Sequence, residues 1–152
     1  MDTDLVIRPF ADPDFEELTE IWYNANRLAY SYVVAHQQYT LDEARAFFRS
    51  GVLPWNQVWV ALLGTSIVGF IAADPTHINQ LAVAVNYQRC GIGSALLRHL
   101  LTTTEGPWRL FTFQRNVSAR RFYEKHGFCV VRFGVSPPPE NEPDVEYLLE
   151  ES

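Results

Sequence analysis

The sequence predicts a mixed α+β fold in which helices cover the faces of a central sheet. The chain has 152 residues, a common length for one domain, and 47% of them are hydrophobic, enough to build a core. Strand-like and helical periodicities alternate along the chain, which is typical of a sheet covered by helices. No internal repeat interrupts this pattern. We therefore expect a single domain over residues 1–152.

The first third of the chain is predicted to form one strand and two helices. An apolar stretch at 5–8 predicts a short strand. Asp12 and Pro13 mark the start of a helix, because Asp favours the cap position and Pro favours the first helical residue. A second helix is expected after Thr40, which stands three residues before Glu43 in a capping-box arrangement.

The remaining chain is predicted to contain more strands than helices. Gly64, Thr65 and Ser66 lie between two β-rich runs and indicate a hairpin. Gly127 fits the position just after a helix, where glycine adopts the left-handed conformation at little cost. The predicted strands cover 58–63, 67–72, 79–85, 109–113, 130–133 and 145–149, and the predicted helices cover 91–103 and 117–126. The proline-rich segment 136–143 is expected to be a loop, because proline cannot donate to a central ladder.

Composition and charge exclude several classes of function. The formal net charge of −6 argues against a nucleic-acid partner, which favours a basic patch. No apolar run reaches the length of a membrane span, and the N-terminus lacks the features of a signal peptide. Cys90 and Cys129 are the only cysteines, and no metal-ligand spacing is present, so we expect a cytoplasmic protein without a metal. Cys129 leads into a predicted strand and is expected to be buried.

The stretch QRCGIGS at 88–94 contains two glycines and connects a predicted strand to the helix that follows it. Backbone N–H groups and the partial positive charge of the helix start would converge there, and together they favour a phosphate. A tight turn that uses glycine only for its conformation is an equally good interpretation of this stretch alone. A phosphate-binding loop of the Walker A type is excluded by its missing Gly-Lys-Ser/Thr. The dinucleotide pattern requires a small residue at position 96, where this chain has Leu96.

Two motifs together carry a resemblance to a known family. Gln88, Gly91 and Gly93 match the pattern Q/R-x-x-G-x-G/A, and residues 116–128 read NVSARRFYEKHGF. In this order and at this separation they resemble the GNAT superfamily of acyl-coenzyme-A-dependent N-acyltransferases, over roughly residues 5–134. The resemblance implies a single, mostly antiparallel sheet of about six to seven strands, splayed between the fourth and fifth, with helices on both faces. It also implies acetyl-CoA as the acyl donor and direct transfer, in a ternary complex, to the primary amine of a small molecule or peptide. A monomer or a homodimer fits this interpretation.

The resemblance implies roles for residues on both sides of the splay. One amide of the fourth strand would polarise the acyl carbonyl while the strand edge binds pantetheine, although an ordinary core strand would look the same. Asn116 would bond the pantetheine arm or simply cap a helix. Tyr123 would protonate the departing thiolate, unless it is only a buried aromatic residue. The implied cofactor-binding residues are Leu81, Ala82, Val83, Gln88, Arg89, Cys90, Gly91, Ile92, Gly93, Ser94, Asn116 and Phe122.

The general base is left open by the sequence. A lysine-like amine has a pKa of about 10.4, so neutralising it at pH 7 costs about 4.6 kcal/mol. Asn79 and Gln80 stand where family members often carry a carboxylate, and amides cannot act as bases. His77, with its suitable intrinsic pKa, and Asp74 are the nearby candidates, and a water relay is an alternative. Two other functions stay open at this point: a catalytically silent acyl-CoA sensor and a nucleotide-binding protein of another class.

Overall fold

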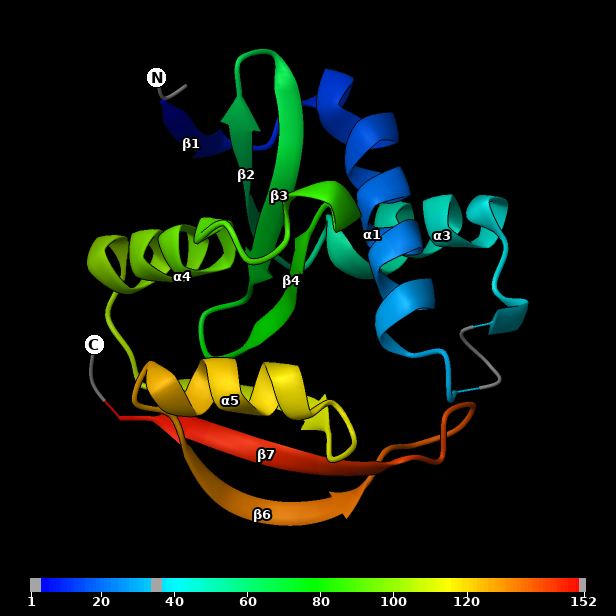
Figure 1. Cartoon of the computed structure of the whole chain (residues 1–152), viewed down its shortest axis with the longest axis vertical. Coiled ribbons are helices and arrows are strands. Elements are labelled where there is room, and N and C mark those ends of the chain that lie inside the picture. Colours follow the sequence, from blue (N-terminus) through cyan, green and yellow to red (C-terminus); the bar gives the residue numbers. More distant parts are fainter. Residues whose placement is uncertain (1–3, 34–36, 151–152) are drawn as a thin grey trace.

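The computed structural model describes residues 4–33 and 37–150, which form two antiparallel sheets with helices on both faces (Figure 1). The four-stranded sheet has the order β1-β2-β3-β4, and the three-stranded sheet has the order β5-β7-β6. The strands of the first sheet are β1 (Leu5–Pro9), β2 (Gln57–Leu63), β3 (Ser66–Ala73) and β4 (Ile78–Val83). Those of the second are β5 (Trp108–Phe113), β6 (Cys129–Val135) and β7 (Pro143–Leu149). The predicted fold class is confirmed, including the hairpin of β2 and β3.

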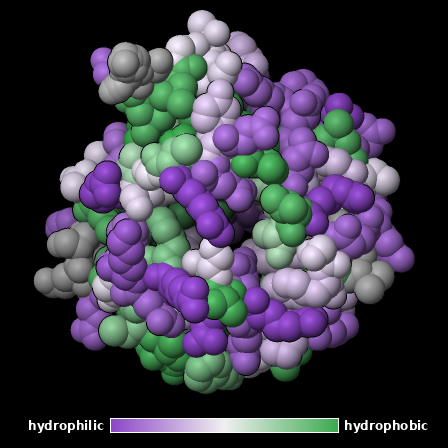
Figure 2. Space-filling model, in the orientation of Figure 1, coloured by the Kyte–Doolittle hydropathy of each residue, from purple (hydrophilic) through white to green (hydrophobic). Residues whose placement is uncertain are grey.

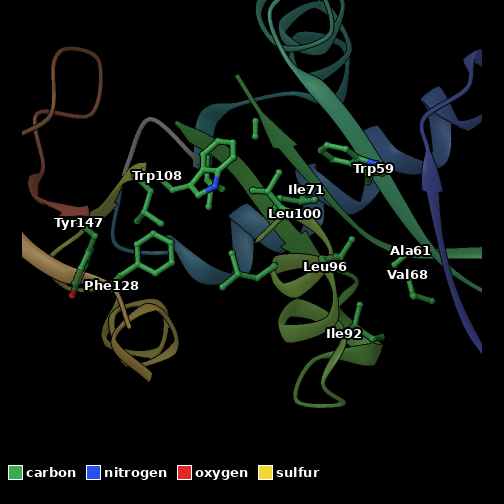
Figure 3. Close-up of a cluster of buried hydrophobic side chains, with 14 of the residues drawn as sticks. Trp59, Ala61, Val68, Ile71, Ile92, Leu96, Leu100, Trp108, Phe128 and Tyr147 are labelled. Carbon is green, nitrogen blue, oxygen red and sulfur yellow. The ribbon is translucent and has the colours of Figure 1, made fainter. Parts of the chain in front are cut away.

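Helices cover the four-stranded sheet from opposite sides. The helices are α1 (Phe15–Ala29), α3 (Leu41–Phe47), α4 (Ile92–Thr103) and α5 (Val117–Lys125). On one face, Leu18 of α1 and Ala44 of α3 pack against alternate sheet residues such as Val60. On the other face, α4 packs against the intervening residues, and this core continues to Tyr147 of the second sheet (Figure 3). Successive side chains of β2 and β3 point to opposite faces of the sheet, and they therefore belong to two separate cores.

The helix termini follow the local signals of the sequence, with one correction. Thr40 Oγ1 accepts from the Glu43 amide at 3.1 Å, and Glu43 Oε1 accepts from the Thr40 amide at 2.9 Å, so the predicted capping box is present. Gly127 ends α5 with a φ of 94°. Asp12 begins only a single 3₁₀ turn, and α1 starts at Phe15.

Within the described residues, backbone pairing links the two sheets where β4 and β5 begin. His77 and Arg109 form a parallel bridge, and the Arg109 amide donates to the Thr76 carbonyl at 3.0 Å. Beyond this point β5 pairs with β7 along its whole length, while β4 keeps β3 as its partner. The strands therefore diverge toward their carboxyl ends, which is the splay that the family resemblance implied.

One predicted strand boundary and one expected burial were wrong. The predicted strand 79–85 ends at Val83, because the chain turns into a 3₁₀ segment at Val85–Tyr87, and Val85 is 42% exposed. Cys129 is exposed rather than buried, because β6 is the edge of its sheet and all of its residues are exposed. Over the residues that the structure describes, no helix is both long and apolar enough to cross a bilayer.

Candidate active site

A cavity of about 680 Å³ occupies the gap between the diverging strands β4 and β5. Its walls come from both strands, the first turn of α4, one side of α5 along its length, and the last turn of α1. Figure 2 shows a hollow near the middle of this face, surrounded mostly by hydrophilic residues. The volume lies within the range of sites that hold small molecules and cofactors.

Among the described residues, the cavity side of β4 is a strand edge along which no other strand pairs beyond the bridge at His77. The Ala84 amide donates to Val68 of β3 at 2.8 Å, and a Cβ atom on Gly69 would lie 2.9 Å from the Ala82 carbonyl. Because backbone groups alternate between the two edges of a strand, those of Leu81 and Val83 face the cavity. The Gln88 amide supports this alternation, since its Nε2 donates to the Val83 carbonyl at 3.2 Å. Leu81 and Val83 therefore direct their main-chain groups toward the cavity, where Gln88 already occupies the Val83 carbonyl, whereas Ala82 directs its own toward β3.

The glycine turn places open backbone amides at one end of the cavity. Gly91 is the N-cap of α4 with a φ of 82°, and Arg89 is also left-handed with a φ of 67°. Successive turns of this kind direct backbone N–H groups into a concave nest. No side chain caps α4, so the first amides of the helix are available to a ligand. The partial positive charge of a helix N-terminus favours a negatively charged one. Gly93 lines the cavity, where a Cβ would stand 3.5 Å from the Phe122 ring.

Most of the predicted cofactor-binding residues line this cavity. They are Leu81, Ala82, Val83, Gln88, Arg89, Gly91, Gly93, Ser94, Asn116 and Phe122, together with Tyr123. Cys90 is exposed outside the lining, where its thiol lies 3.7 Å from the Gln88 carbonyl. Ile92 is 4% exposed and belongs to the core under α4, so only its main chain could serve a ligand.

Two tyrosines and an asparagine meet on the β5 side of the cavity. Asn116 Oδ1 accepts from the Ala119 amide at 3.1 Å and caps α5, while its Nδ2 donates to the Tyr30 hydroxyl at 3.4 Å. Asn116 thus caps its helix and also lines the cavity. Burial, with a smaller contribution from Tyr30, raises the pKa of Tyr123, so its hydroxyl keeps its proton at neutral pH. Tyr30 has no motif of its own, and only the way α1 ends over β5 brings it here.

The predicted bases lie away from the cavity wall. His77 Nδ1 is 2.7 Å from the Thr76 hydroxyl and 3.8 Å from Asp74 Oδ1, at the closed end of the splay. Burial raises the pKa of Asp74, but hydrogen bonds from Asn79 and two backbone amides outweigh it and leave the pKa lowered. Gln80 accepts from Trp22 Nε1 at 2.8 Å. Among the described residues that line the cavity, none carries a carboxylate or an imidazole.

The late loop approaches the segment that follows α1. Arg115, just after β5, makes two hydrogen bonds of 2.7 and 2.8 Å to the Glu142 carboxylate. Its guanidinium also lies 4.2 Å from the centre of the Tyr32 ring. These contacts hold the end of the 136–143 loop beside the segment that follows α1.

The site combines a free strand edge, an open helix N-terminus and a protonated phenol. This arrangement suits an enzyme that takes a group from an extended, phosphate-bearing donor. Residues 54–130 match the family model described as an acetyltransferase (GNAT) domain. The N-acetyltransferase YafP of Escherichia coli is 32% identical over 130 residues, covering 83% of this chain and 82% of YafP. The chain therefore belongs to the GNAT acetyltransferase family, whose enzymes are acyl-CoA-dependent.

Further relatives agree in sequence and in fold. The peptidyl-lysine N-acetyltransferase YjaB of E. coli is 28% identical over 127 residues, covering 82% of each chain. The solution structure of apo YjaB matches with a TM-score of 0.78 over 95% of this chain and 97% of its own, at 24% identity. The Arabidopsis thaliana enzyme NAA60, solved with a bisubstrate analogue, matches with a TM-score of 0.70 over 97% of this chain and 98% of its own, at 17% identity. At these identities the two structures support the fold alone.

Proposed function

We propose that this protein transfers an acetyl group from acetyl-CoA to a primary amine by direct attack within a ternary complex. The observation that carries the proposal is the continuous path along the cavity from the Gly91 turn, past the free edge of β4, to Tyr123. This path offers diphosphate-binding amides at one end and a proton donor at the other.

The residues of the cavity suit acetyl-CoA as the donor. The amides around Gly91 and Gly93 would hold the diphosphate, with the Arg89 side chain as an added cation. Main-chain groups of Leu81 and Val83 would bind the pantetheine arm as a neighbouring strand does. One of these amides would polarise the acyl carbonyl, and bound acetyl-CoA would supply the acetyl group as a thioester.

Tyr123 would supply the proton that the reaction needs at sulfur. In the transfer a C–N bond forms, the C–S bond breaks and the thiolate accepts the Tyr123 proton. Asn116 and Tyr30 would hold the acyl end of the cavity in place through their hydrogen bond. Since the described cavity wall offers no carboxylate or imidazole, the amine proton would leave through water.

Acceptors would enter beside the end of α1 and the late loop. The acceptor would be a peptidyl lysine, as the name of YjaB states for that relative, or a small-molecule amine. We expect the protein to carry out this reaction in the cytoplasm.

The proposal is tested by thiol release from acetyl-CoA with a panel of amines and peptides. Tyr123→Phe should lower kcat by about a hundredfold or more while leaving the KM for acetyl-CoA nearly unchanged. Tyr87→Phe, at a tyrosine outside the cavity lining, is the matched control and should retain wild-type rates. An unchanged kcat in Tyr123→Phe, under conditions where chemistry limits the rate, would remove Tyr123 as the acid. Acetyl-CoA binding without thiol release for any amine would contradict the transferase itself.

A further inference from the structure

The cavity between β4 and β5 continues to the face of the sheets on which α1 lies. Leu110 packs in the core under α4, so the neighbouring Phe111 points to the opposite face, where it is 53% exposed. Leu28, in the last turn of α1, is 58% exposed, and both Phe111 and Leu28 line the cavity. An acceptor that enters beside α1 therefore approaches from the face opposite to α4 and α5.

Gln80 of β4 reaches the cavity on the α1 face with its side chain. The main chain of every second residue of β4 faces β3, and Gln80 lies two residues before Ala82, whose carbonyl faces that strand. The contact of Gln80 with the cavity therefore comes from its half-buried side chain. Trp22 of α1, which is buried in the core on that face, donates its Nε1 to Gln80 Oε1 at 2.8 Å.

The tryptophan determines which end of the Gln80 carboxamide is left for a ligand. An indole nitrogen can only donate, so the atom bonded to it is the amide oxygen, and the amide nitrogen is the other end. Gln80 Nε2 has no hydrogen-bond partner among the described residues. A donor directed at the attacking amine would occupy the electron pair that the reaction needs, so the productive partner of Nε2 is an oxygen atom of the acceptor.

Asn26 adds a second carboxamide to this side of the cavity. It lies one turn after Trp22 on α1, so the two side chains share a face of the helix, and it lines the cavity. Its side chain makes no hydrogen bond within the part of the chain that the structure describes, so Oδ1 is available to an amine N–H. Gln80 and Asn26 together offer one donor and one acceptor, which are the partners of the carbonyl and the amine of an N-terminal residue.

We propose that Gln80 makes the enzyme selective for amines with a carbonyl group on the adjacent carbon, as in the N-terminal residue of a peptide. This inference rests on the proposed function and narrows its acceptors. Gln80 directly precedes Leu81, whose main chain faces the donor path, so an oxygen bound to Nε2 lies about one residue, roughly 3.3 Å along the strand, from the acyl end. The carbonyl of an N-terminal residue is attached to the carbon that bears the amine, whereas a whole side chain separates a lysine ε-amine from the nearest carbonyl.

The charges along the cavity favour a peptide over a free amino acid. A free amino acid brings a carboxylate, which a charged partner binds best. Among the described lining residues the basic ones are Arg89, in the glycine turn, and Lys125, on α5, and both belong to elements of the donor side. Leu28 and Phe111 border the α1 side with apolar surface, which favours an apolar first side chain.

Two matched acceptors isolate the carbonyl group. Leucinamide carries an apolar side chain and a carbonyl beside its amine, and 3-methylbutylamine is the same molecule without the carboxamide. Thiol release from acetyl-CoA gives kcat/KM for each, expressed per neutral amine so that their different pKa values cancel. The wild type should prefer leucinamide by about fivefold to thirtyfold. Free leucine and Nα-acetyl-lysinamide, which offers only an ε-amine, should both be poorer acceptors than leucinamide.

Substitutions at Gln80 assign the preference to its amide nitrogen. Gln80→Glu keeps an oxygen for Trp22 Nε1 but replaces the donor by an acceptor, so the preference for leucinamide should fall at least about fivefold. Gln80→Met, which cannot act as a base, should lose the preference as well, and thermal melts establish that each variant is folded. Gln57→Glu, at an exposed glutamine of β2 outside the cavity lining, is the matched control and should keep the wild-type preference.

The outcomes separate this inference from the proposed function. If no amine releases thiol, the transferase itself is refuted, and this inference with it. If amines are acetylated but the wild type does not prefer leucinamide, or if both folded Gln80 variants keep its preference, the role of Gln80 is overturned while the transferase stands. Equal use of free leucine and leucinamide, or better use of Nα-acetyl-lysinamide, would overturn the peptide N-terminus as the acceptor.

Discussion

Gly93→Ala tests the glycine turn directly, because it should affect the stability of the fold and the affinity for acetyl-CoA in opposite directions. A Cβ at this position would meet the Phe122 ring at 3.5 Å and Val83 at 3.8 Å, which are ordinary van der Waals contacts. Gly93 is the second residue of α4, where alanine has the higher helix propensity. We therefore expect the variant to be as stable as the wild type, or more stable by up to about 1 kcal/mol.

The affinity for acetyl-CoA should change in the opposite direction. A methyl group at Gly93 would stand between the diphosphate and the amides of the first turn. Losing one charge-assisted hydrogen bond costs about 1.5 to 3 kcal/mol, which is about tenfold to a hundredfold in Kd. Gly91→Ala is the informative companion, since a φ of 82° disfavours any side chain by about 1 to 2 kcal/mol even though nothing lies within 4 Å.

Thermal unfolding and donor titration of the two variants measure these effects. A truncated donor, acetyl-pantetheine, lacks the diphosphate, so wild type and Gly93→Ala should use it with the same KM. If Gly93→Ala binds acetyl-CoA as tightly as the wild type does, the amides of this turn do not hold the diphosphate. If it loses affinity for acetyl-pantetheine equally, the methyl group disturbs the pantetheine path instead.

Three further predictions follow from local contacts. Thr40→Ala should lower the free energy of unfolding by about 1 kcal/mol, because it removes the acceptor of the Glu43 amide, while Thr40→Ser should not; thermal melts decide this. The ion pair with Arg8 lowers the pKa of Asp14, so its stabilisation is complete above about pH 5 and is lost as the pH falls through the folded pKa. The difference in Tm between wild type and Asp14→Asn should accordingly shrink in acid, and a constant difference would contradict the ion pair's role. Because the described cavity wall lacks a carboxylate or imidazole, kcat/KM should rise tenfold per pH unit up to the pKa of the acceptor amine, and a plateau above pH 6.5 would indicate a histidine base.

Signals that act within a few residues predicted the fold and much of the site. The capping box at Thr40, the hairpin around Gly64 and the left-handed Gly127 each depend on neighbours in the chain. The glycine turn belongs to the same class, because a strand that enters a helix through glycine builds its anion site locally. These features could be read before any tertiary contact was known.

Features that depend on strand register and strand partners could not be predicted from the sequence. Alternation along β4 directs the backbone of Leu81 and Val83 toward the cavity and that of Ala82 toward β3, and only the pairing with β3 fixes this phase. Tyr30 enters the cavity because α1 ends opposite β5. Cys129 was misplaced for the same reason, since nothing local distinguishes an edge strand from a central one.

The connectivity explains why the cavity-side edge of β4 and the uncapped start of α4 lie together. β4, α4 and β5 form a crossover between parallel strands, so the carboxyl ends of both strands point to the same side of the sheet. The helices that follow these strands, α4 and α5, must both begin there. Their caps differ in sequence: Asn116 occupies an amide of α5 with its own side chain, whereas Gly91 has none to offer α4. Of the two helix starts at the cavity, only that of α4 is left without a side-chain cap, and this difference in cap residue leaves its first amides open to a ligand.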